Sequence, residues 1–196
     1  MRDERKTIQE VRQQKTEKII KQVLDQNYIT LTIENLIINE NLTEGKTHVE
    51  CHTLVEGESV IIDSEGKGMV NALYSGFMKE FSSDCLSLKD IRFKDFRMKI
   101  ADRKKQTDAH IMAKLTVMNI KNDILIFADK SRSMNASAAR AVSKCIEYFI
   151  NSENAFLVLK DAIKDAQERD RPDLVKRYTS QLAEIVKNTS YKKIIK

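Results

Sequence analysis

Two stretches of this sequence repeat one order of elements, three strands followed by a helix. Residues 29–62 contain three runs in which apolar and polar residues alternate, the period of a half-buried strand, and helical spacing of apolar residues follows over 70–81. The same order returns over 91–127 and 134–149. A chain that repeats such a unit is expected to build antiparallel strands covered on one face by helices.

We therefore predict an α+β fold of two pseudo-repeated βββα units, which together form an antiparallel sheet covered by helices. The two copies share few residues. Asn71-Ala72 corresponds to Asn135-Ala136 at an offset of 64 (135 − 71), near the start of each helix. The predicted repeat thus depends on the order and length of the elements more than on sequence identity.

Helical spacing of apolar residues also occurs outside the repeated units. An amphipathic helix precedes the first unit, a further helix is expected over 156–166, and Pro172 begins a last one, since proline is favoured in the first helical turn. The predicted organisation is an N-terminal helix over 1–27, a (βββα)₂ domain over 28–150, and a C-terminal helical hairpin with a basic tail over 151–196.

Composition restricts the class of protein. Hydrophobic residues make up 41% of the 196 residues, enough for one core, and no apolar run approaches the roughly 18 residues of a membrane span. The 34 Lys and Arg exceed the 29 Asp and Glu, but the signs alternate along the chain, which predicts a solvated surface of mixed charge. The three cysteines are widely spaced and indicate neither a disulfide framework nor a zinc finger. We expect a cytoplasmic protein without a membrane segment.

The sequence offers few residues for catalysis. Its three histidines lie on expected strands, and none accompanies a nucleophile motif such as Gly-x-Ser-x-Gly. His48 and His52 share a strand face on either side of Glu50, which suits a surface metal, but an exposed polar face accounts for the pattern more simply. We therefore predict no enzyme activity, no cofactor and no metal.

The most informative local motif is Gly66-Lys67-Gly68, between the third strand and the helix that follows. Two glycines there permit a tight turn and leave amides open at a helix N-terminus, where an anion can bind. The motif lacks the third glycine of a dinucleotide fingerprint and the Gly-Lys-Ser/Thr of a P-loop, which argues against nucleotide binding. Close packing of the helix on the strand accounts for it equally well.

A small ligand with a carboxylate, an ammonium group and an apolar tail would suit the two loops that precede the internal helices. The amides would receive the carboxylate, and Asp63, Glu65 or Asp129 would receive the ammonium group. The candidate ligand-binding residues are Gly66, Lys67, Gly68, Val70, Asn71, Asp129, Ser133, Met134 and Asn135.

Duplex RNA is the alternative ligand. Lys130-Ser131-Arg132 precedes the second internal helix, and a helix start flanked by cations suits a phosphate backbone. A helix, three strands and a helix is also the order of a double-stranded RNA-binding domain. Such domains concentrate several cations at that helix start, whereas uncharged residues follow Arg132 here, so nucleic acid is the second hypothesis.

Residues 66–73, Gly-Lys-Gly-Met-Val-Asn-Ala-Leu, are similar to the Gly-x-Gly-Pro-Val-Asp/Asn-Ala-Leu motif of one known family. This is the C-terminal regulatory and dimerisation domain of 2-isopropylmalate synthase and citramalate synthase. Residues 88–100 resemble the strand that follows in the family, and residues 135–148 resemble its second helix. The resemblance covers about residues 28–150.

The chain departs from the family at several points. Met69 replaces the usual proline, the glycine expected near Asp129 is missing, and the catalytic barrel with its His-x-His motif is absent from this sequence. The resemblance implies a two-unit domain that dimerises and binds leucine or isoleucine as a feedback inhibitor. It therefore predicts a non-catalytic homodimer with a branched-chain amino acid as effector and a separate catalytic partner.

Overall fold

A computed structural model of the chain describes residues 8–101 and 109–186, and the predicted basic tail lies outside these residues. A short 3₁₀ turn over Asp25–Asn27 follows the first helix. In chain order the helices and strands are α1 (Ile8–Leu24), β1 (Leu31–Asn41), β2 (Lys46–Val55), β3 (Glu58–Gly66), α2 (Met69–Phe81), α3 (Leu86–Lys89), β4 (Arg92–Ile100), β5 (Ile111–Met118), β6 (Ile124–Ser131), α4 (Met134–Glu168) and α5 (Pro172–Ile185).

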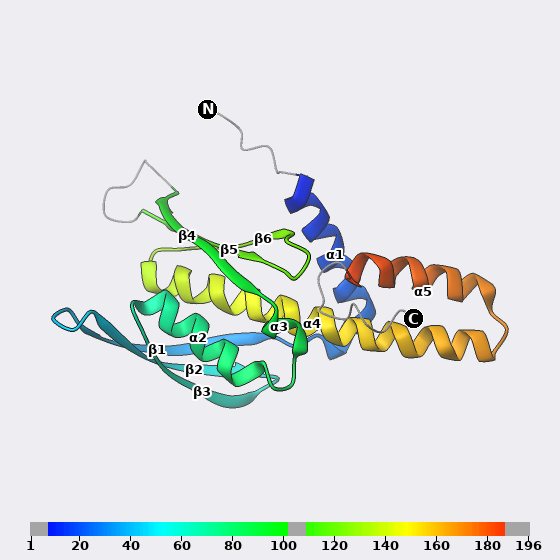
Figure 1. Cartoon of the computed structure of the whole chain (residues 1–196), viewed down its shortest axis with the longest axis horizontal. Helices are drawn as coiled ribbons and strands as arrows, with labels where there is room; N and C mark the ends of the chain where they lie inside the picture. Colours follow the sequence, from blue (N-terminus) through cyan, green and yellow to red (C-terminus); the bar gives the residue numbers. More distant parts are fainter. Residues whose placement is uncertain (1–7, 102–108, 187–196) are drawn as a thin grey trace.

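The described strands form two separate antiparallel sheets, sheet A in the order β1-β2-β3 and sheet B in the order β4-β5-β6. Helix α2 packs on β2 and β3, whereas α4 packs on β5, β6 and β1. Figure 1 shows sheet A, the pair of helices and sheet B as successive layers. The α+β class is confirmed, but the expectation of one antiparallel sheet is wrong, because α2 and α4 lie between two sheets.

Each sheet turns one apolar face toward the helices. On the central strand of sheet A, Val49, Cys51 and Thr53 are buried, while the residues between them face outward. On the central strand of sheet B, the buried residues are Ala113 and Leu115, followed by Val117. The alternation of apolar and polar residues along the sequence therefore corresponds to the inner and outer faces of both sheets.

Helix α4 is one continuous helix of 35 residues. The sequence predicted a helix ending near residue 150 and a second beginning near residue 156, with polar residues between them. In the structure, Asn151, Ser152 and Glu153 are buried inside α4. The prediction of two helices is wrong because these polar side chains form hydrogen bonds within the fold instead of ending the helix.

Polar side chains in the middle of α4 form hydrogen bonds with the backbone at the starts of β1 and α3. Asn151 Nδ2 donates to the Ile29 carbonyl at 2.7 Å, and the Ile29 amide donates to Asn151 Oδ1 at 2.8 Å, just before β1. The carboxylate of Glu153 accepts hydrogen bonds from the amides of Leu86 and Ser87, at 3.1 and 2.7 Å. Backbone groups of both segments thus find their partners on α4.

Helix α1 packs against β6, one of the two edge strands of sheet B. Gln13 Nε2 donates to the Ile126 carbonyl at 2.9 Å, and the Ile126 amide donates to Gln13 Oε1 at 3.0 Å. This side-chain amide occupies the two positions at which a neighbouring strand would bond to Ile126. Ile20 and Leu24, which are buried, hold α1 against α4.

Helix α5 turns back along α4 and also contacts α1. Pro172 stands in its first turn, as the sequence predicts. Ile185, near its end, is fully buried in the core. Among the helices of the described ranges, none has the length and apolar character that crossing a bilayer requires.

Candidate functional site

The loop between β3 and α2 is a tight turn in which the absence of a side chain at Gly66 is sterically required. A Cβ on Gly66 would lie 2.6 Å from the Ala72 amide nitrogen and 2.6 Å from Asn71 Oδ1. The Lys67 amide donates to Asn71 Oδ1 at 3.1 Å, so the Asn71 side chain closes the turn. The structural role expected of the motif, close packing between strand and helix, is therefore confirmed at Gly66.

The first turn of α2 has no side-chain cap. Gly68 is the N-cap residue in extended conformation, and it offers no side chain to bond the first-turn amides. Val70 lies half-buried in that turn and packs against the core. The start of α2 thus combines uncapped backbone donors with an apolar side chain, and the partial positive charge of a helix N-terminus favours an anion there.

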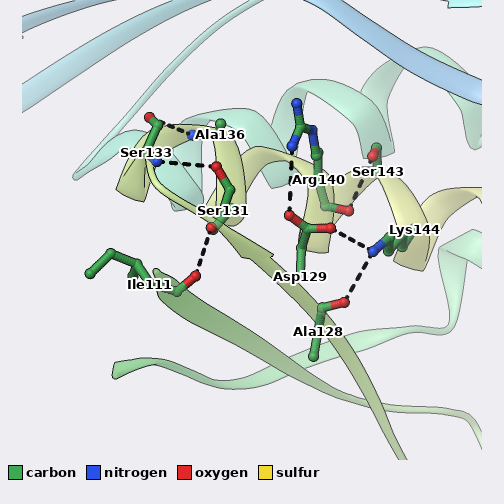
Figure 2. Close-up of polar contacts among 10 residues, drawn as sticks. Ile111, Ala128, Asp129, Ser131, Ser133, Ala136, Arg140, Ser143 and Lys144 are labelled. Atoms are coloured by element: carbon green, nitrogen blue, oxygen red, sulfur yellow. Dashed lines mark hydrogen bonds and ion pairs between the residues drawn. The ribbon is translucent and has the colours of Figure 1, made fainter. Parts of the chain in front are cut away.

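The start of α4 is capped by the chain itself. Ser133 Oγ accepts a hydrogen bond from the Ala136 amide at 3.2 Å, and the Ser133 amide donates to Ser131 Oγ at 3.1 Å (Figure 2). The Ser133 hydroxyl therefore occupies the position that an anion would take at this helix start. Met134, the first helical residue, is 55% exposed.

The two helix starts correspond at a different offset from the one matched in the sequence. Gly68 and Ser133 are the two N-cap residues, so the structural offset is 65 (133 − 68) instead of 64. Asn71 and Asn135 are consequently not equivalent positions. The sequence match arose because both helices contain an Asn-Ala pair, but the two pairs stand one position apart relative to the helix starts.

The Asp129 carboxylate pairs with cationic side chains of α4. Its Oδ1 lies 2.6 Å from Lys144 Nζ and its Oδ2 lies 4.0 Å from Arg140, as Figure 2 shows. The Asp129 side chain is only 11% exposed. An external ammonium group would have to displace Lys144, so Asp129 contributes to holding α4 on β6 instead of offering an open carboxylate.

A groove of about 330 Å³ lies between β1 and the first turns of α4. Its aliphatic side chains come from β1 and from alanines of α4. Charges of opposite sign accompany them, Glu34 on β1 and Arg140 on α4. The lining consists of Ile33, Glu34, Asn35, Leu36, Ile38, Ser133, Asn135, Ala136, Ala139 and Arg140.

A larger cavity of about 430 Å³ lies between α1, β6 and α4. Charged groups of this cavity bond to one another. Lys21 pairs with Glu17 at 2.8 Å, and Glu147 accepts from the Tyr28 hydroxyl at 3.0 Å. Because these groups already satisfy each other and the predicted site residues do not line this cavity, we place the candidate site in the β1–α4 groove.

The groove contains two of the nine predicted residues, Ser133 and Asn135. The other seven do not line it: Gly66, Lys67, Gly68, Val70, Asn71, Asp129 and Met134. Sequence reasoning also missed the β1 side of the groove, where Ile33 and Leu36 contribute to the wall. The alternating pattern of β1 predicted an inner face, but nothing local indicated that α4 would pack beside that strand.

The outer face of sheet A brings both candidate metal histidines to the surface, each with its own carboxylate. His48 Nε2 lies 2.9 Å from Asp63 Oδ1, and His52 Nε2 lies 2.6 Å from Glu50 Oε1. Four residues along a strand separate the histidines by about 13 Å, too far for one ion. In the described ranges, no group of three or more metal-binding side chains is arranged around a common point.

The three cysteines are free thiols buried in the core. Burial raises the pKa of Cys145, and it also raises the pKa of Cys85, where the Glu153 carboxylate adds to the effect. A thiol that stays protonated is a poor nucleophile. Their environment therefore favours packing over reactivity.

We expect stability to decrease at alkaline pH through Cys145. Its pKa is raised in the folded state, so its contribution to stability is complete below the unfolded value of about 8.5 and declines as the pH rises above it. Each further pH unit costs about 1.4 kcal/mol for such a group. Urea unfolding at pH 7.5 and 10 should show a smaller pH-dependent loss in Cys145→Ala than in the unmodified chain; equal losses would contradict this prediction.

Comparison with known proteins leaves the family of this chain undecided. No protein-family model matches the chain, and no curated protein matches it at significant similarity. The site must therefore be interpreted from its own residues. These are an aliphatic wall, two opposite charges and the start of α4.

Proposed function

We propose that this chain is a non-catalytic regulatory domain of the kind found in 2-isopropylmalate and citramalate synthases, and that it binds a branched-chain amino acid. The β1–α4 groove is the observation that carries the proposal. Ile33 and Leu36 offer an aliphatic surface, while Arg140 can pair with a carboxylate and Glu34 with an ammonium group. Leucine or isoleucine carries these three features in a size that fits the groove.

The pseudo-repeat is part of the proposal. Both first strands carry an irregularity of register at a corresponding place, between Ile33 and Asn35 in β1 and between Phe93 and Asp95 in β4. Each unit then ends in a helix that begins with methionine three residues after its last strand. These shared features support descent of the two units from one βββα ancestor.

A thermal-shift experiment tests the ligand. In 5 mM leucine or isoleucine, we expect the melting temperature to rise by about 3–6 °C, as binding at about ten times the dissociation constant would produce in a chain of this size. Ala136→Phe should fill the groove and abolish the shift. Ala128→Phe, an exposed position outside the groove, is the matched control and should keep it.

Two outcomes would contradict the proposed ligand site. If neither leucine, isoleucine nor valine changes the melting temperature or produces heat in calorimetry, the chain is no sensor of these amino acids. If the shift persists in Ala136→Phe while that variant remains folded, the ligand binds elsewhere. In the second case the groove is not the binding site, but the amino acid is still a ligand of the chain.

The proposed partner in assembly is a second copy of the chain. Apolar residues of β4 on the helix-facing side of sheet B stay partly exposed: Phe93, Met98 and Ile100 are 44%, 37% and 63% exposed. Covering such residues in a homodimer would remove apolar surface from water. The buried free thiols are compatible with a reducing compartment. We propose that the dimer is cytoplasmic and that a separate catalytic chain is its regulatory target.

We expect sedimentation equilibrium to give a dimer mass at about 50 μM, a concentration at which a stable homodimer is assembled. The double substitution Met98→Asp and Ile100→Asp puts two charges on the exposed apolar face and should shift the mass to that of the monomer. Ile61→Asp, at a residue that is equally exposed on the outer face of sheet A, should leave the dimer intact. A monomer mass for the unmodified chain would overturn the proposed homodimer.

A further inference from the structure

Side chains bond to the open edge of β6, one of the edge strands of sheet B. Gln13 bonds both the amide and the carbonyl of Ile126, and Lys144 Nζ donates to the Ala128 carbonyl at 3.2 Å. These backbone groups cannot at the same time bond a strand from another molecule. Covering an edge in this way protects it against pairing with another chain.

Side chains also bond to the edge strand β1 of sheet A. The Leu31 amide donates to Glu147 Oε2 of α4 at 3.1 Å, and the Leu36 amide donates to Asn35 Oδ1 at 2.9 Å. Backbone donors are therefore already engaged at two places along β1. A foreign strand would have to displace both side chains.

The edge strand β4 lies on the other side of sheet B from β6 (Figure 1). In an antiparallel sheet, successive residues direct their backbone groups to opposite neighbours. Ile126 bonds Gln13 and so points away from β5, which means that its register partner Thr116 directs its backbone groups toward β4. There Thr116 lies opposite Asp95, so the backbone of Asp95 bonds into the sheet.

Three residues of β4 direct their backbone groups to the open edge, Phe96, Met98 and Ile100, because they alternate with the residues that bond to β5. The same alternation continues beyond the strand, where the Ala101 amide donates to the His110 carbonyl at 2.7 Å. Within residues 8–101 and 109–186, no side chain bonds the backbone of the three edge-facing residues. The edge of β4 thus differs from those of β1 and β6.

One substitution between the pseudo-repeats explains part of this difference. Asn35 and Asp95 are the first residues after the register irregularity of β1 and of β4. Asn35 bonds the amide of Leu36, whereas Asp95 pairs with the Arg97 guanidinium at 2.6 Å. The amide of Phe96, which corresponds to that of Leu36, is therefore left for another partner.

We propose that the homodimer forms by antiparallel pairing of β4 with β4 of a second copy, which joins the two copies of sheet B into one sheet of six strands. This inference rests on the proposed homodimer and specifies its contact. Pairing would bond the edge-facing groups of Phe96, Met98 and Ile100. It would also bring the exposed side chains of Met98 and Ile100 against those of the second copy and remove apolar surface from water.

The other edges explain why the partner strand is β4 itself. Pairing of β4 with β1 or β6 of another copy would break the hydrogen bonds of Glu147, Gln13 and Lys144. Pairing with β3 would be heterologous and would leave another β4 open at the end of every assembly. Pairing of two β4 strands about a two-fold axis avoids both problems and ends at the dimer.

Sedimentation equilibrium of the full chain tests the pairing through the backbone. Met98→Pro removes an edge-facing amide, and proline is tolerated in an edge strand where the lost N–H bonds nothing in its own sheet. We expect this variant to stay folded by circular dichroism and to raise the dissociation constant of the dimer at least about a hundredfold. Met98→Ala, the matched control, keeps the amide and should raise it only about tenfold.

Hydrogen exchange of the unmodified chain, followed by NMR, gives a second test that needs no variant. Between about 5 and 500 μM chain, exchange of the Phe96, Met98 and Ile100 amides should slow at least about tenfold, because pairing protects them. The Ile126 amide is bonded to Gln13 within one chain, so its exchange should not depend on concentration.

The outcomes separate the pairing from the proposals on which it rests. A dimer of Met98→Pro as stable as that of Met98→Ala, or exchange of the β4 amides that is independent of concentration, would overturn the strand pairing and leave the homodimer in place. Assemblies larger than a dimer would indicate pairing of β4 with β3 and would also overturn it. A monomer mass for the unmodified chain would remove the homodimer itself, whereas the leucine-induced thermal shift tests the ligand independently.

Discussion

Replacing Glu153 by alanine is expected to lower the free energy of unfolding by about 3 kcal/mol or more. The Glu153 carboxylate is buried in the middle of α4, where it accepts from the amides of Leu86 and Ser87 and from the Cys85 thiol. Alanine would leave the amides without this acceptor, and each buried unpaired group costs about 1–3 kcal/mol. Urea unfolding followed by circular dichroism measures the difference.

The matched control lies on the same helix. Glu168 is exposed and its carboxylate lies 4.0 Å from Lys164, so Glu168→Ala should change the free energy of unfolding by less than about 0.5 kcal/mol. A loss below about 1 kcal/mol for Glu153→Ala would show that other groups hold α3 equally well. The polar middle of α4 would then not be an anchor.

Phe149→Ala is expected to cost about 3–5 kcal/mol, the usual range when a buried phenylalanine is truncated. Phe149 is fully buried on α4, with its ring centre 6.2 Å from that of Phe127 and 5.4 Å from that of Tyr148. Alanine would leave a cavity where sheet B packs on the helix layer. Thermal and urea unfolding of the purified variant would measure the loss.

Two further substitutions calibrate this effect. Phe149→Leu keeps most of the buried volume and should cost about 1–2 kcal/mol. Leu157→Ala removes a side chain that is partly exposed on the same helix and should cost less than about 1 kcal/mol. If Phe149→Ala cost no more than Leu157→Ala, the core would have to repack without a cavity.

The sequence predicted most elements of the fold because local periodicity reports which face of a strand or helix is buried. The inner face of α4 is an example, since Ala138, Val142, Ile146 and Phe149 follow the helical spacing and are all buried. The length of α4 could not be predicted in the same way. Asn151 is polar in sequence, and the group it bonds, Ile29, lies 122 residues away.

The candidate site was predictable only in part for a related reason. The motif at Gly66 marks a turn that the local sequence specifies through Asn71. The groove depends on β1 packing beside α4, and residues such as Leu36 and Ala136 acquire a shared role only through that long-range contact.

The contact of Gln13 with Ile126 has a consequence for how the chain behaves at high concentration. An uncovered sheet edge recruits strands from other molecules and so promotes aggregation. Here the Gln13 side chain occupies the backbone amide and carbonyl of Ile126 on the edge strand β6. Release of α1 would uncover these two groups, so we expect a chain that loses this helix to aggregate more readily.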